Sequence, residues 1–587
     1  MTGPEPSNIN HIWADLLVEE LLRAGVGLFC LAPGSRSTPL VRAVAANSRA
    51  AHLMHFDERG TAFSALGFGR ATRRPAAWIT TSGTAVANGM PAVVEASADA
   101  VPMLLLTADR PPELRATGAN QTIDQVKLFG DYVRWQFDMP APDARIDPAF
   151  VLTTADQAVH RACRAPAGPV HLNVMYREPL APEPDGGTYD RYLDALPEWA
   201  AGHWPYTRYA ASHSRCTGTG VLWRRLREAR RGLIVAGRLD TRAQGDAVRW
   251  LSDRLGWPIL PDVCSQLRLG GDSMPDYPAY YYDLVLSSAS FREINRPDAV
   301  LYFGARSTSK RLNRFIAEAR PRDFVVIREA PERTDPHHRV TGYVEADIVG
   351  FCAELIDLVE TGPAAASEWT HRWTAASETA GRLLDDQLGE VLSEPVAARL
   401  LTARAPEGSG LMLASSMPVR DTDTYGAEAQ GAPFVAANRG ASGIDGTVAT
   451  AAGLARGLQR EVTLLLGDLA LLHDLNSLAL LAASPEPVIV VVINNHGGGI
   501  FSFLPIARHR EVFESFFGTP HAFSFEHAAR MFDLDYASPA SLDDFARIYE
   551  EALSERSSCI IEVTTDRAEN VGLHRRVEAA VAEAVSP

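Results

Sequence analysis

The stretch LLLGDLALLHDL, residues 464–475, places Asp468 directly after an apolar run that is typical of a buried strand. The leucines after it recur at helical spacing, and a second apolar run, VIVVVINN at 488–495, follows them. Strand, helix and strand in this order predict a right-handed crossover, which brings Asp468 and Asn495 to the carboxyl ends of two parallel strands. Open α/β sheets bind ligands at this edge, so the stretch predicts both a fold class and the place of a site.

The same alternation of helix-like segments and short apolar runs continues along the chain. Examples are GLFCLAPGS (27–35), PMLLLTADR (102–110) and RRGLIVAGRLD (230–240). Two stretches rich in Pro, Gly or Ala, at 179–187 and 361–369, are typical of linkers. The 587 residues are too many for one core. We therefore predict three doubly wound α/β domains with mainly parallel sheets, spanning residues 1–185, 205–362 and 370–587.

The first and third of these parts resemble each other. ERGTAFSALGFGRAT from Glu58 and NRGASGIDGTVATAAGLARG from Asn438 share an Arg-Gly start and a helix rich in Gly and Ala. In each part the next strand ends in a glycine turn, at Gly83 and at Gly467. This pattern predicts two α/β domains of common plan with a site between their strand ends, and chance similarity among α/β repeats is the alternative.

Composition narrows the class of protein. The net charge of −16, without a basic cluster, argues against nucleic-acid binding. The six cysteines are scattered and form no CxxC, which indicates neither a disulfide framework nor a zinc site. No apolar run approaches the length of a spanning helix, and the N-terminus lacks a targeting pattern. We expect a cytoplasmic protein without membrane insertion.

Hard oxygen donors gather around Asp468. A carboxylate from Asp468, an amide oxygen from Asn495 and a backbone carbonyl at Gly497 suit Mg²⁺, which keeps its other positions for water and phosphate. The glycines at 497–499 let the backbone approach a diphosphate closely. For Asp468 alone, a helix-capping role is an open alternative.

Other phosphate motifs are absent or weak. A Walker-type loop needs Gly-Lys, but the two lysines of the chain, Lys127 and Lys310, follow Val126 and Ser309. The glycine spacing in GASGIDG (440–446) is weak evidence for a dinucleotide, because no acidic residue is clearly placed for a ribose.

A Gly-Asp pair followed by Asn-Asn at this distance resembles the diphosphate and metal motif of thiamine diphosphate enzymes. Within them, the chain resembles the 2-succinyl-5-enolpyruvyl-6-hydroxy-3-cyclohexene-1-carboxylate synthase family of menaquinone biosynthesis. The stretches that carry this resemblance are APGSRSTPL (32–40), HFDERG (55–60), TSGTAVANGMPAVVEA (81–96), TADRPPELR (107–115), GANQTI (118–123), SKRL (309–312), NRGASGIDG (438–446), GDLALLHDLN (467–476) and NNHGGGIFSFLP (494–505). Two departures from the wider superfamily, Leu469 after Gly-Asp and no histidine near GANQTI, look normal for this family.

The resemblance implies an activity and its partners. The family decarboxylates 2-oxoglutarate with thiamine diphosphate and Mg²⁺, for which Mn²⁺ can substitute, and adds the succinyl unit to isochorismate. The implied assembly is a homodimer or a dimer of dimers, in which Glu58 reaches a cofactor whose diphosphate is held by a partner subunit. Glu58 matches the glutamate that activates the cofactor's aminopyrimidine, and a role at a helix N-terminus is the alternative.

The resemblance also implies a set of site residues. The matching catalytic positions are Glu58, Gln121, Arg36 and Arg439. The cofactor-binding positions are Glu58, Ser416, Ile444, Gly467, Asp468 and Asn495, with the metal on Asp468, Asn495 and Gly497. The substrate-binding positions are Ser35, Arg36, Arg110, Asn120, Gln121, Lys310, Arg311, Ser416, Arg420, Arg439, Ile500, Phe501 and Leu504.

Arginine suits this task because its planar fork pairs bidentately with carboxylate, and both substrates are dicarboxylates. By resemblance, Ser416 and Arg420 are placed for the succinyl carboxylate, and Arg36, Arg110, Gln121, Lys310 and Arg311 for isochorismate. Ile500, Phe501 and Leu504 are expected to form an apolar wall that keeps water from the reacting atoms, with core packing as the alternative.

Three competing interpretations of the whole chain stay open. The first is another thiamine diphosphate-dependent 2-oxoacid decarboxylase or an acetohydroxyacid-type synthase acting on pyruvate. The second is a catalytically silent protein of the same fold that binds a regulator, and the third is a dinucleotide-dependent oxidoreductase. The many arginines within the motifs argue against the first, and an intact set of Glu58, Asp468 and Asn495 argues against the second.

Overall fold

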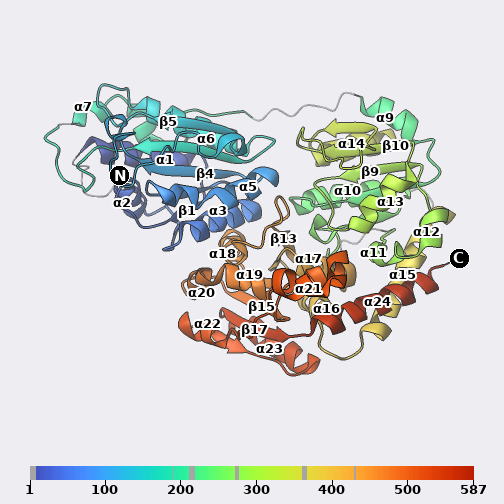
Figure 1. The fold of residues 1–587 in the computed structure, drawn as a ribbon. Coiled ribbons are helices and arrows are strands. Elements are labelled where there is room, and N and C mark those ends of the chain that lie inside the picture. The colour runs from blue at the N-terminus through green and yellow to red at the C-terminus, as the bar shows by residue number, and fades with distance from the viewer. Residues whose placement is uncertain are drawn as a thin grey trace. The chain divides into compact units, whose positions relative to one another are not determined.

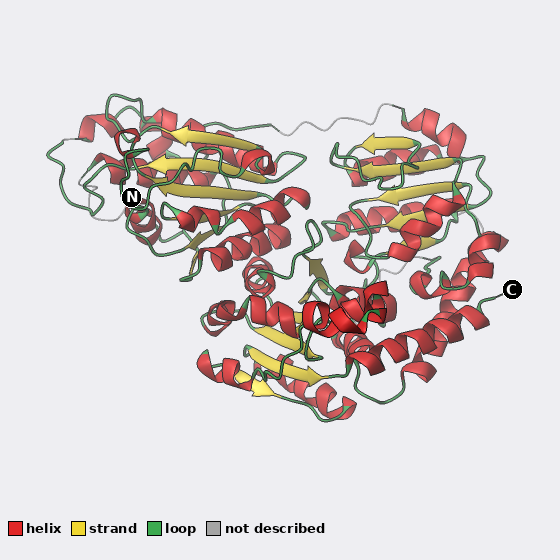
Figure 2. Cartoon of the chain, viewed as in Figure 1, coloured by secondary structure: helices red, strands yellow, loops and turns green. Residues whose placement is uncertain are grey.

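The computed structural model of the chain describes residues 8–187, 189–210, 218–270, 276–359, 367–428 and 431–586. Residues 361–366 of the second predicted linker lie outside them. The described chain contains three parallel α/β sheets, which confirms the predicted fold class (Figures 1 and 2). Among its helices, none combines the length and the apolar character that crossing a bilayer requires.

The N-terminal sheet has six parallel strands in the order β2-β1-β3-β4-β6-β5. Its strands are β1 (Leu28–Leu31), β2 (His52–Met54), β3 (Ala76–Thr80), β4 (Met103–Asp109), β5 (Trp135–Met139) and β6 (Pro169–Met175). The helices of this part are α1 (Ile9–Arg23), α2 (Thr38–Ala46), α3 (Glu58–Thr72), α4 (Thr84–Ala87), α5 (Met90–Ala98), α6 (Ala149–Cys163), α7 (Asp190–Leu193) and α8 (Pro197–Ala201). Phe29 and Leu31 pack in one buried cluster with residues of α1, α2 and α6. Trp78 lies on the opposite face of the sheet, where its indole N–H donates a hydrogen bond to the hydroxyl of Thr61 in α3 at 2.9 Å.

The central sheet has five parallel strands in the order β11-β10-β9-β7-β8. Its strands are β7 (Gly232–Ala236), β8 (Ile259–Pro261), β9 (Ala299–Phe303), β10 (Asp323–Arg328) and β11 (Gly342–Glu345). The helices of this part are α9 (Thr219–Leu226), α10 (Arg242–Leu255), α11 (Tyr282–Val285), α12 (Ala289–Ile294), α13 (Lys310–Ala319) and α14 (Ile348–Leu358). Successive strand residues belong to different clusters: Val300 packs with Phe315 of α13, whereas Leu301 packs with Phe351 of α14. Helices therefore cover both faces, as expected when a parallel strand is apolar throughout.

The C-terminal sheet has six strands in the order β13-β12-β14-β15-β17-β16. Its strands are β12 (Gly410–Leu413), β13 (Phe434–Ala437), β14 (Val462–Gly467), β15 (Val488–Asn494), β16 (Asp535–Ala537) and β17 (Cys559–Thr564). The helices of this part are α15 (Glu368–Leu388), α16 (Glu394–Arg404), α17 (Met417–Tyr425), α18 (Thr447–Leu458), α19 (Asp468–His473), α20 (Leu478–Ala482), α21 (Arg510–Phe513), α22 (Glu526–Met531), α23 (Leu542–Glu555) and α24 (Arg567–Ala584). One face of this sheet packs with residues of α16 and α23 in a buried cluster.

The N-terminal and C-terminal sheets have the same strand order when each is numbered along the chain, which confirms the common plan predicted from the sequence. The two helices of the repeated stretches, α3 and α18, pack directly against each other. Gly67 lies against the backbone of Thr450, and Gly453 lies against the backbone of Ser64, so neither position has room for a Cβ. The shared Gly/Ala composition is therefore a requirement of close helix packing.

The chain forms two compact units. One comprises Met1–Ser212, Asn438–Val462 and Leu472–Val488, and the other comprises His213–Ala437, Thr463–Leu471 and Ile489–Pro587. The α18 segment thus belongs to the same compact unit as the N-terminal sheet. The three domain boundaries stay a prediction.

Candidate active site

Glu58 is the first residue of α3, just beyond the carboxyl end of β2. Asp57 caps this helix, because its carboxylate accepts a hydrogen bond from the backbone N–H of Arg59 at 2.8 Å. The half-buried Glu58 carboxylate instead accepts a bond from the side-chain amide of Asn88 at 3.1 Å. Capping thus occupies Asp57, and the carboxylate of Glu58 is available for another task.

Two predicted substrate arginines meet at the carboxyl edge of the N-terminal sheet. Arg36 donates to the carbonyl of Tyr176 at 3.1 Å and pairs with Glu178 at 3.3 Å. Arg110 donates to the hydroxyl of Ser82, and burial, followed by the nearby charge of Arg36, lowers its pKa. Two cations held this close to each other favour an anion at the same edge, where the exposed carboxylate of Glu178 pairs with Arg36.

The loop with Asn120 and Gln121 lies beside them. Arg110 also donates to the carbonyl of Gln121 at 2.8 Å, and the Gln121 amide donates to the carbonyl of Ser82 at 2.8 Å. Gln121 is exposed and has a φ of 54°, a left-handed conformation that non-glycine residues adopt rarely. Ser35 and Asn120 are exposed as well. The structure therefore brings Arg36, Arg110 and Gln121 together at this edge.

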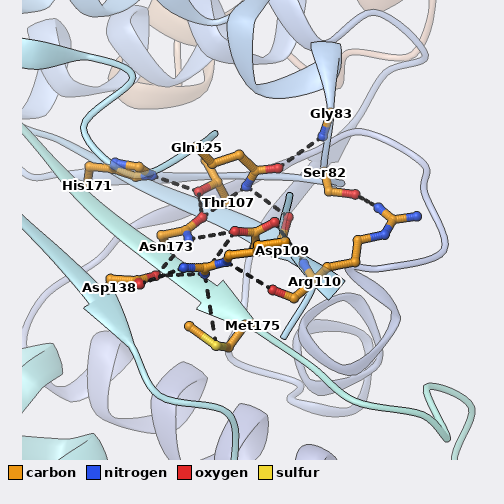
Figure 3. Close-up of polar contacts among 12 residues, drawn as sticks. Ser82, Gly83, Thr107, Asp109, Arg110, Gln125, Asp138, His171, Asn173 and Met175 are labelled. Atoms are coloured by element: carbon orange, nitrogen blue, oxygen red, sulfur yellow. Dashed lines mark hydrogen bonds and ion pairs between the residues drawn. The ribbon is translucent and has the colours of Figure 1, made fainter. Parts of the chain in front are cut away.

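A buried network beneath Arg110 holds this edge in place (Figure 3). Asn173 of β6 donates to Asp109 at 2.9 Å and to Asp138 at 2.8 Å, and it accepts from Gln125 at 2.9 Å. The carboxylate of Asp109 in turn accepts from the backbone N–H of Arg110 at 2.7 Å. The network fixes the backbone from which the Arg110 side chain starts.

A neutral histidine completes this network. Thr107 donates its hydroxyl hydrogen to Asn173 at 3.0 Å, so it accepts from the Nε2–H of His171 at 2.7 Å. Burial lowers the pKa of His171 to about 4. Gln125 uses its oxygen to accept from the backbone N–H of Gly83 at 3.0 Å, which ties the glycine turn after β3 to the same set.

The loop that carries Arg439 and Ile444 is held by a buried carboxylate. Glu95 of α5 accepts hydrogen bonds from the backbone N–H groups of Gly440 at 2.8 Å and Ala441 at 2.7 Å. Burial, followed by the charge of Asp99, raises the pKa of Glu95. Ile444 is half-buried and stands outside the buried core, which favours a wall beside a ligand over ordinary core packing. Arg439 is half-buried too.

Asp468, Asn495 and Gly497 come together at the carboxyl ends of β14 and β15. One oxygen of the buried Asp468 carboxylate accepts from its neighbour Leu469 at 2.6 Å, and the other accepts from the backbone N–H of Gly497 at 2.9 Å. Burial raises the pKa of Asp468, and these hydrogen bonds oppose the shift. Gly497 has a φ of 148°, and a Cβ there would collide with the carbonyl of Gly518, so the position requires glycine.

The two adjacent asparagines, Asn494 and Asn495, differ in whether their side-chain oxygen is available to a ligand. Asn494 donates to Glu562 at 2.6 Å, and its oxygen accepts from the backbone N–H of His496 at 3.2 Å. Asn495 donates to Glu394 at 2.9 Å, but its buried oxygen has no hydrogen-bond partner among the described residues. An unsatisfied buried oxygen next to a buried carboxylate fits a small divalent cation with oxygen ligands. The described residues contain no group of three or more His, Cys, Asp or Glu side chains that could hold a metal ion, so this candidate site depends on amide and backbone oxygens as well.

Five further predicted residues lie in two segments that follow β12 and β15. Ser416, between β12 and α17, has a φ of 78°, and its carbonyl accepts from Arg420. Ile500 and Phe501 are half-buried and Leu504 is 40% exposed, so none of the three is a core residue. Strained backbone of the kind seen at Ser416 is concentrated at functional sites.

Lys310 and Arg311 open α13 but differ in their surroundings. Lys310 is exposed. Arg311 is tied into the protein, because it pairs with Asp283 at 2.7 Å and with Glu578 at 2.8 Å. The exposed ammonium is the more available of the two for a substrate.

Comparison with known proteins agrees with this geometry. Three family profiles match: the N-terminal thiamine pyrophosphate binding domain at residues 13–128, the middle domain at 190–413 and the C-terminal thiamine pyrophosphate binding domain at 423–563. The 2-succinyl-5-enolpyruvyl-6-hydroxy-3-cyclohexene-1-carboxylate synthase of Rubrobacter xylanophilus is 56% identical over 97% of this chain and 98% of its own. The protein of the same name from Salinibacter ruber is 53% identical over 100% of this chain and 98% of its own, and that from Chlorobaculum tepidum is 44% identical over 97% of both. The chain belongs to this synthase family.

As a member of the synthase family, the chain is a thiamine diphosphate-dependent enzyme with three α/β domains, as the sequence predicted. Sequence reasoning missed several polar residues that hold the synthase site residues in place. His521 is one of them: its Nδ1 accepts from the backbone N–H of Phe523 at 3.2 Å, so its Nε2–H donates to Asp468 at 3.1 Å. Glu95, Gln125, Asn173 and Glu394 are others. Glu95 lies within the quoted stretch at 81–96 without being singled out there, and the other three lie outside the quoted stretches.

Proposed function

We propose that the chain decarboxylates 2-oxoglutarate with thiamine diphosphate and adds the succinyl unit to isochorismate, forming 2-succinyl-5-enolpyruvyl-6-hydroxy-3-cyclohexene-1-carboxylate in menaquinone biosynthesis. The observation that carries this proposal is 56% identity over 97% of the chain to a synthase of that name. The activity makes the chain a carboligating transferase. The paired guanidinium groups of Arg36 and Arg110 support substrates with two carboxylates.

We also propose that Asp468, the amide oxygen of Asn495 and the backbone carbonyl of Gly497 hold Mg²⁺, with Mn²⁺ as a substitute. The unsatisfied oxygen of Asn495 supports this donor set. Gly467 and the glycines that follow leave room for the diphosphate, because backbone without side chains permits close approach. When bound, thiamine diphosphate supplies the electron sink that lets a 2-oxoacid lose its carboxylate.

The side chains of the chain then have separate tasks. Glu58 would hold a proton at the pyrimidine ring nitrogen of the cofactor, and Ile444 would support the bound cofactor from one side. Ser416 and Arg420 bind the distal carboxylate of 2-oxoglutarate. The residues that bind and orient isochorismate are Ser35, Arg36, Arg110, Asn120, Gln121, Lys310, Arg311 and Arg439. Ile500, Phe501 and Leu504 keep water from the reacting atoms.

We further propose a homodimer or a dimer of dimers, and a cytoplasmic location, on the basis of family membership. In such a dimer Glu58 of one subunit serves the cofactor held by its partner. Sedimentation of the purified protein tests the assembly, and a monomer that is fully active at all concentrations would contradict it.

The direct test is carbon dioxide release from 2-oxoglutarate by the purified protein with thiamine diphosphate and Mg²⁺. We expect release to depend on the cofactor and to rise with isochorismate as isochorismate is consumed. If 2-oxoglutarate is inert and pyruvate reacts, the cofactor assignment stands and the substrate assignment is wrong.

A further inference from the structure

We propose that Glu394 is a positioning residue that decides which atom of the Asn495 amide faces the metal site. The inference deepens the proposed function, since it rests on Asn495 being a metal ligand. It concerns a residue of α16, more than ninety positions before Asn495 in the chain, which no motif of the sequence marks.

The argument begins with an asymmetry between the two ends of an amide. An asparagine side chain offers an oxygen that accepts and a nitrogen that donates, and the two ends have nearly the same shape. Only the oxygen binds a divalent cation. The side chain is therefore useful as a ligand only if something else fixes which end points to the cation.

Glu394 supplies that constraint. It is 3% exposed, and one of its oxygens accepts from the Asn495 amide nitrogen at 2.9 Å and from the hydroxyl of Thr565 at 3.2 Å. Because this Glu394 oxygen is the acceptor in both hydrogen bonds, the amide must turn its nitrogen toward it. The Asn495 oxygen is then directed away from Glu394, where it is buried without a partner among the described residues.

The neighbouring asparagine provides an internal comparison. Glu562 orients Asn494 in the same way, accepting from its amide nitrogen at 2.6 Å. The oxygen of Asn494, however, already accepts from the backbone N–H of His496 at 3.2 Å. Both asparagines are oriented by buried glutamates, but only the one oriented by Glu394 leaves an oxygen for a cation.

The experiment measures Mn²⁺ binding in the presence of thiamine diphosphate by calorimetry, with Glu394→Leu, Glu394→Gln and the matched control Glu562→Gln. Removing the acceptor in Glu394→Leu should weaken Mn²⁺ binding about 10- to 100-fold, the usual range for residues that orient metal ligands. Glu394→Gln keeps an oxygen that can accept from Asn495 and Thr565, so its affinity should stay within a few-fold of the original. Glu562→Gln should leave the affinity unchanged.

A kinetic readout separates positioning from general damage. Saturating Mn²⁺ should restore kcat in Glu394→Leu, because the variant loses metal affinity and no reacting group. If Glu394→Leu does not fold, Glu394→Asp is the deciding variant. It keeps the carboxyl group but shortens the side chain by one methylene, which moves the acceptor away from Asn495. We expect its Mn²⁺ affinity to fall by nearly 10-fold.

Three results would overturn the inference: unchanged affinity in the leucine or aspartate variant, an equal loss in the glutamine variant, or a kcat that saturating metal does not restore. If the unaltered protein binds neither Mn²⁺ nor thiamine diphosphate, the proposed function fails as well. Normal binding by the unaltered protein together with unaffected variants contradicts this inference alone.

Discussion

The N-terminal and C-terminal sheets have the same strand order, yet the polar side chains at the ends of their fourth strands, β4 and β15, differ in their hydrogen-bond partners. β4 ends at Asp109, whose carboxylate accepts from the Arg110 backbone at 2.7 Å and from Asn173 at 2.9 Å, and pairs with Arg115 at 3.0 Å. β15 is followed by Asn495, whose buried oxygen has no partner in the described part of the chain. At the edge of the N-terminal sheet, neighbouring groups of the protein satisfy the carboxylate. At the edge of the C-terminal sheet, the Asn495 oxygen is available to accept a bond from a ligand.

The comparison shows how one strand order supports two tasks, positioning a substrate-binding arginine and binding a cation. A closed network is rigid, so it can aim the side chain of Arg110 at a substrate while its own members stay out of the chemistry. An unsatisfied buried oxygen costs on the order of 1–3 kcal/mol, which a bound cation can offset. The two edges therefore predict opposite responses to substitution: lost stability at the first and lost cofactor binding at the second.

The largest effect is expected at the ends of the second strands, where Glu58 follows β2 and Arg439 follows β13. Glu58→Gln removes the carboxylate that holds a proton on the cofactor but keeps the side-chain shape. Turnover should fall on the order of 10²- to 10⁴-fold, the usual contribution of acid–base catalysis, while cofactor affinity is retained. Steady-state rates measure the turnover, and a parallel calorimetric titration measures the cofactor affinity. Normal turnover in this variant would contradict the role of Glu58.

The second prediction pairs the aspartates of the two edges. Asp468→Ala should abolish Mg²⁺-dependent binding of thiamine diphosphate in calorimetry, because it removes the charged metal ligand. Asp109→Asn should leave that binding intact and lower the free energy of unfolding by about 1–3 kcal/mol, since Arg115 then keeps only Asp138 of its two carboxylate partners. Similar loss of cofactor affinity in both variants would mean that the two edges do not differ as described.

A third prediction separates Arg110 from the network that supports it. Arg110→Met should raise the KM for isochorismate about 10- to 100-fold, the equivalent of one charge-assisted hydrogen bond, with little change in the KM for 2-oxoglutarate. Arg115→Met, its matched control, should lower stability and change neither KM. Equal effects on the two substrates would remove Arg110 from the isochorismate site.

The sequence predicted some of these features and not others, for physical reasons. The strand-helix-strand pattern around Asp468 and the repeat of the Arg-Gly helices follow from apolar periodicity and glycine content, which are local. The roles of Glu394 and Asn173 depend on contacts with residues far along the chain, and no local pattern signals them. Arg311 illustrates the same limit, because its ion pairs with Asp283 and Glu578 join residues that are far apart in the chain, and its motif does not signal them.

The smallest effect concerns pH and the edge of the N-terminal sheet. Burial lowers the pKa of His171 from its ordinary value of 6.5 to about 4, and the charge of Asp138 opposes the shift. Below pH 6.5 the unfolded chain binds a proton that the folded chain does not, so stability falls as the pH falls toward 4. By pH 5.5 this loss should be about 1 kcal/mol.

The matched variant for this prediction is His171→Gln, which keeps an N–H donor for Thr107 but does not titrate. Denaturant unfolding at pH 7.5 and pH 5.5 measures the difference between the protein and this variant. An identical pH dependence in the two would show that His171 does not contribute.

The contrast between the two edges is tested most directly by anomalous diffraction from crystals grown with Mn²⁺ and thiamine diphosphate. We predict a Mn²⁺ peak bonded to Asp468, to the carbonyl of Gly497 and to the Asn495 oxygen, with the Asn495 nitrogen still on Glu394, and no peak at the Asp109 edge. A Mn²⁺ ion bound away from Asn495, or one held beside Asp109, would contradict the account.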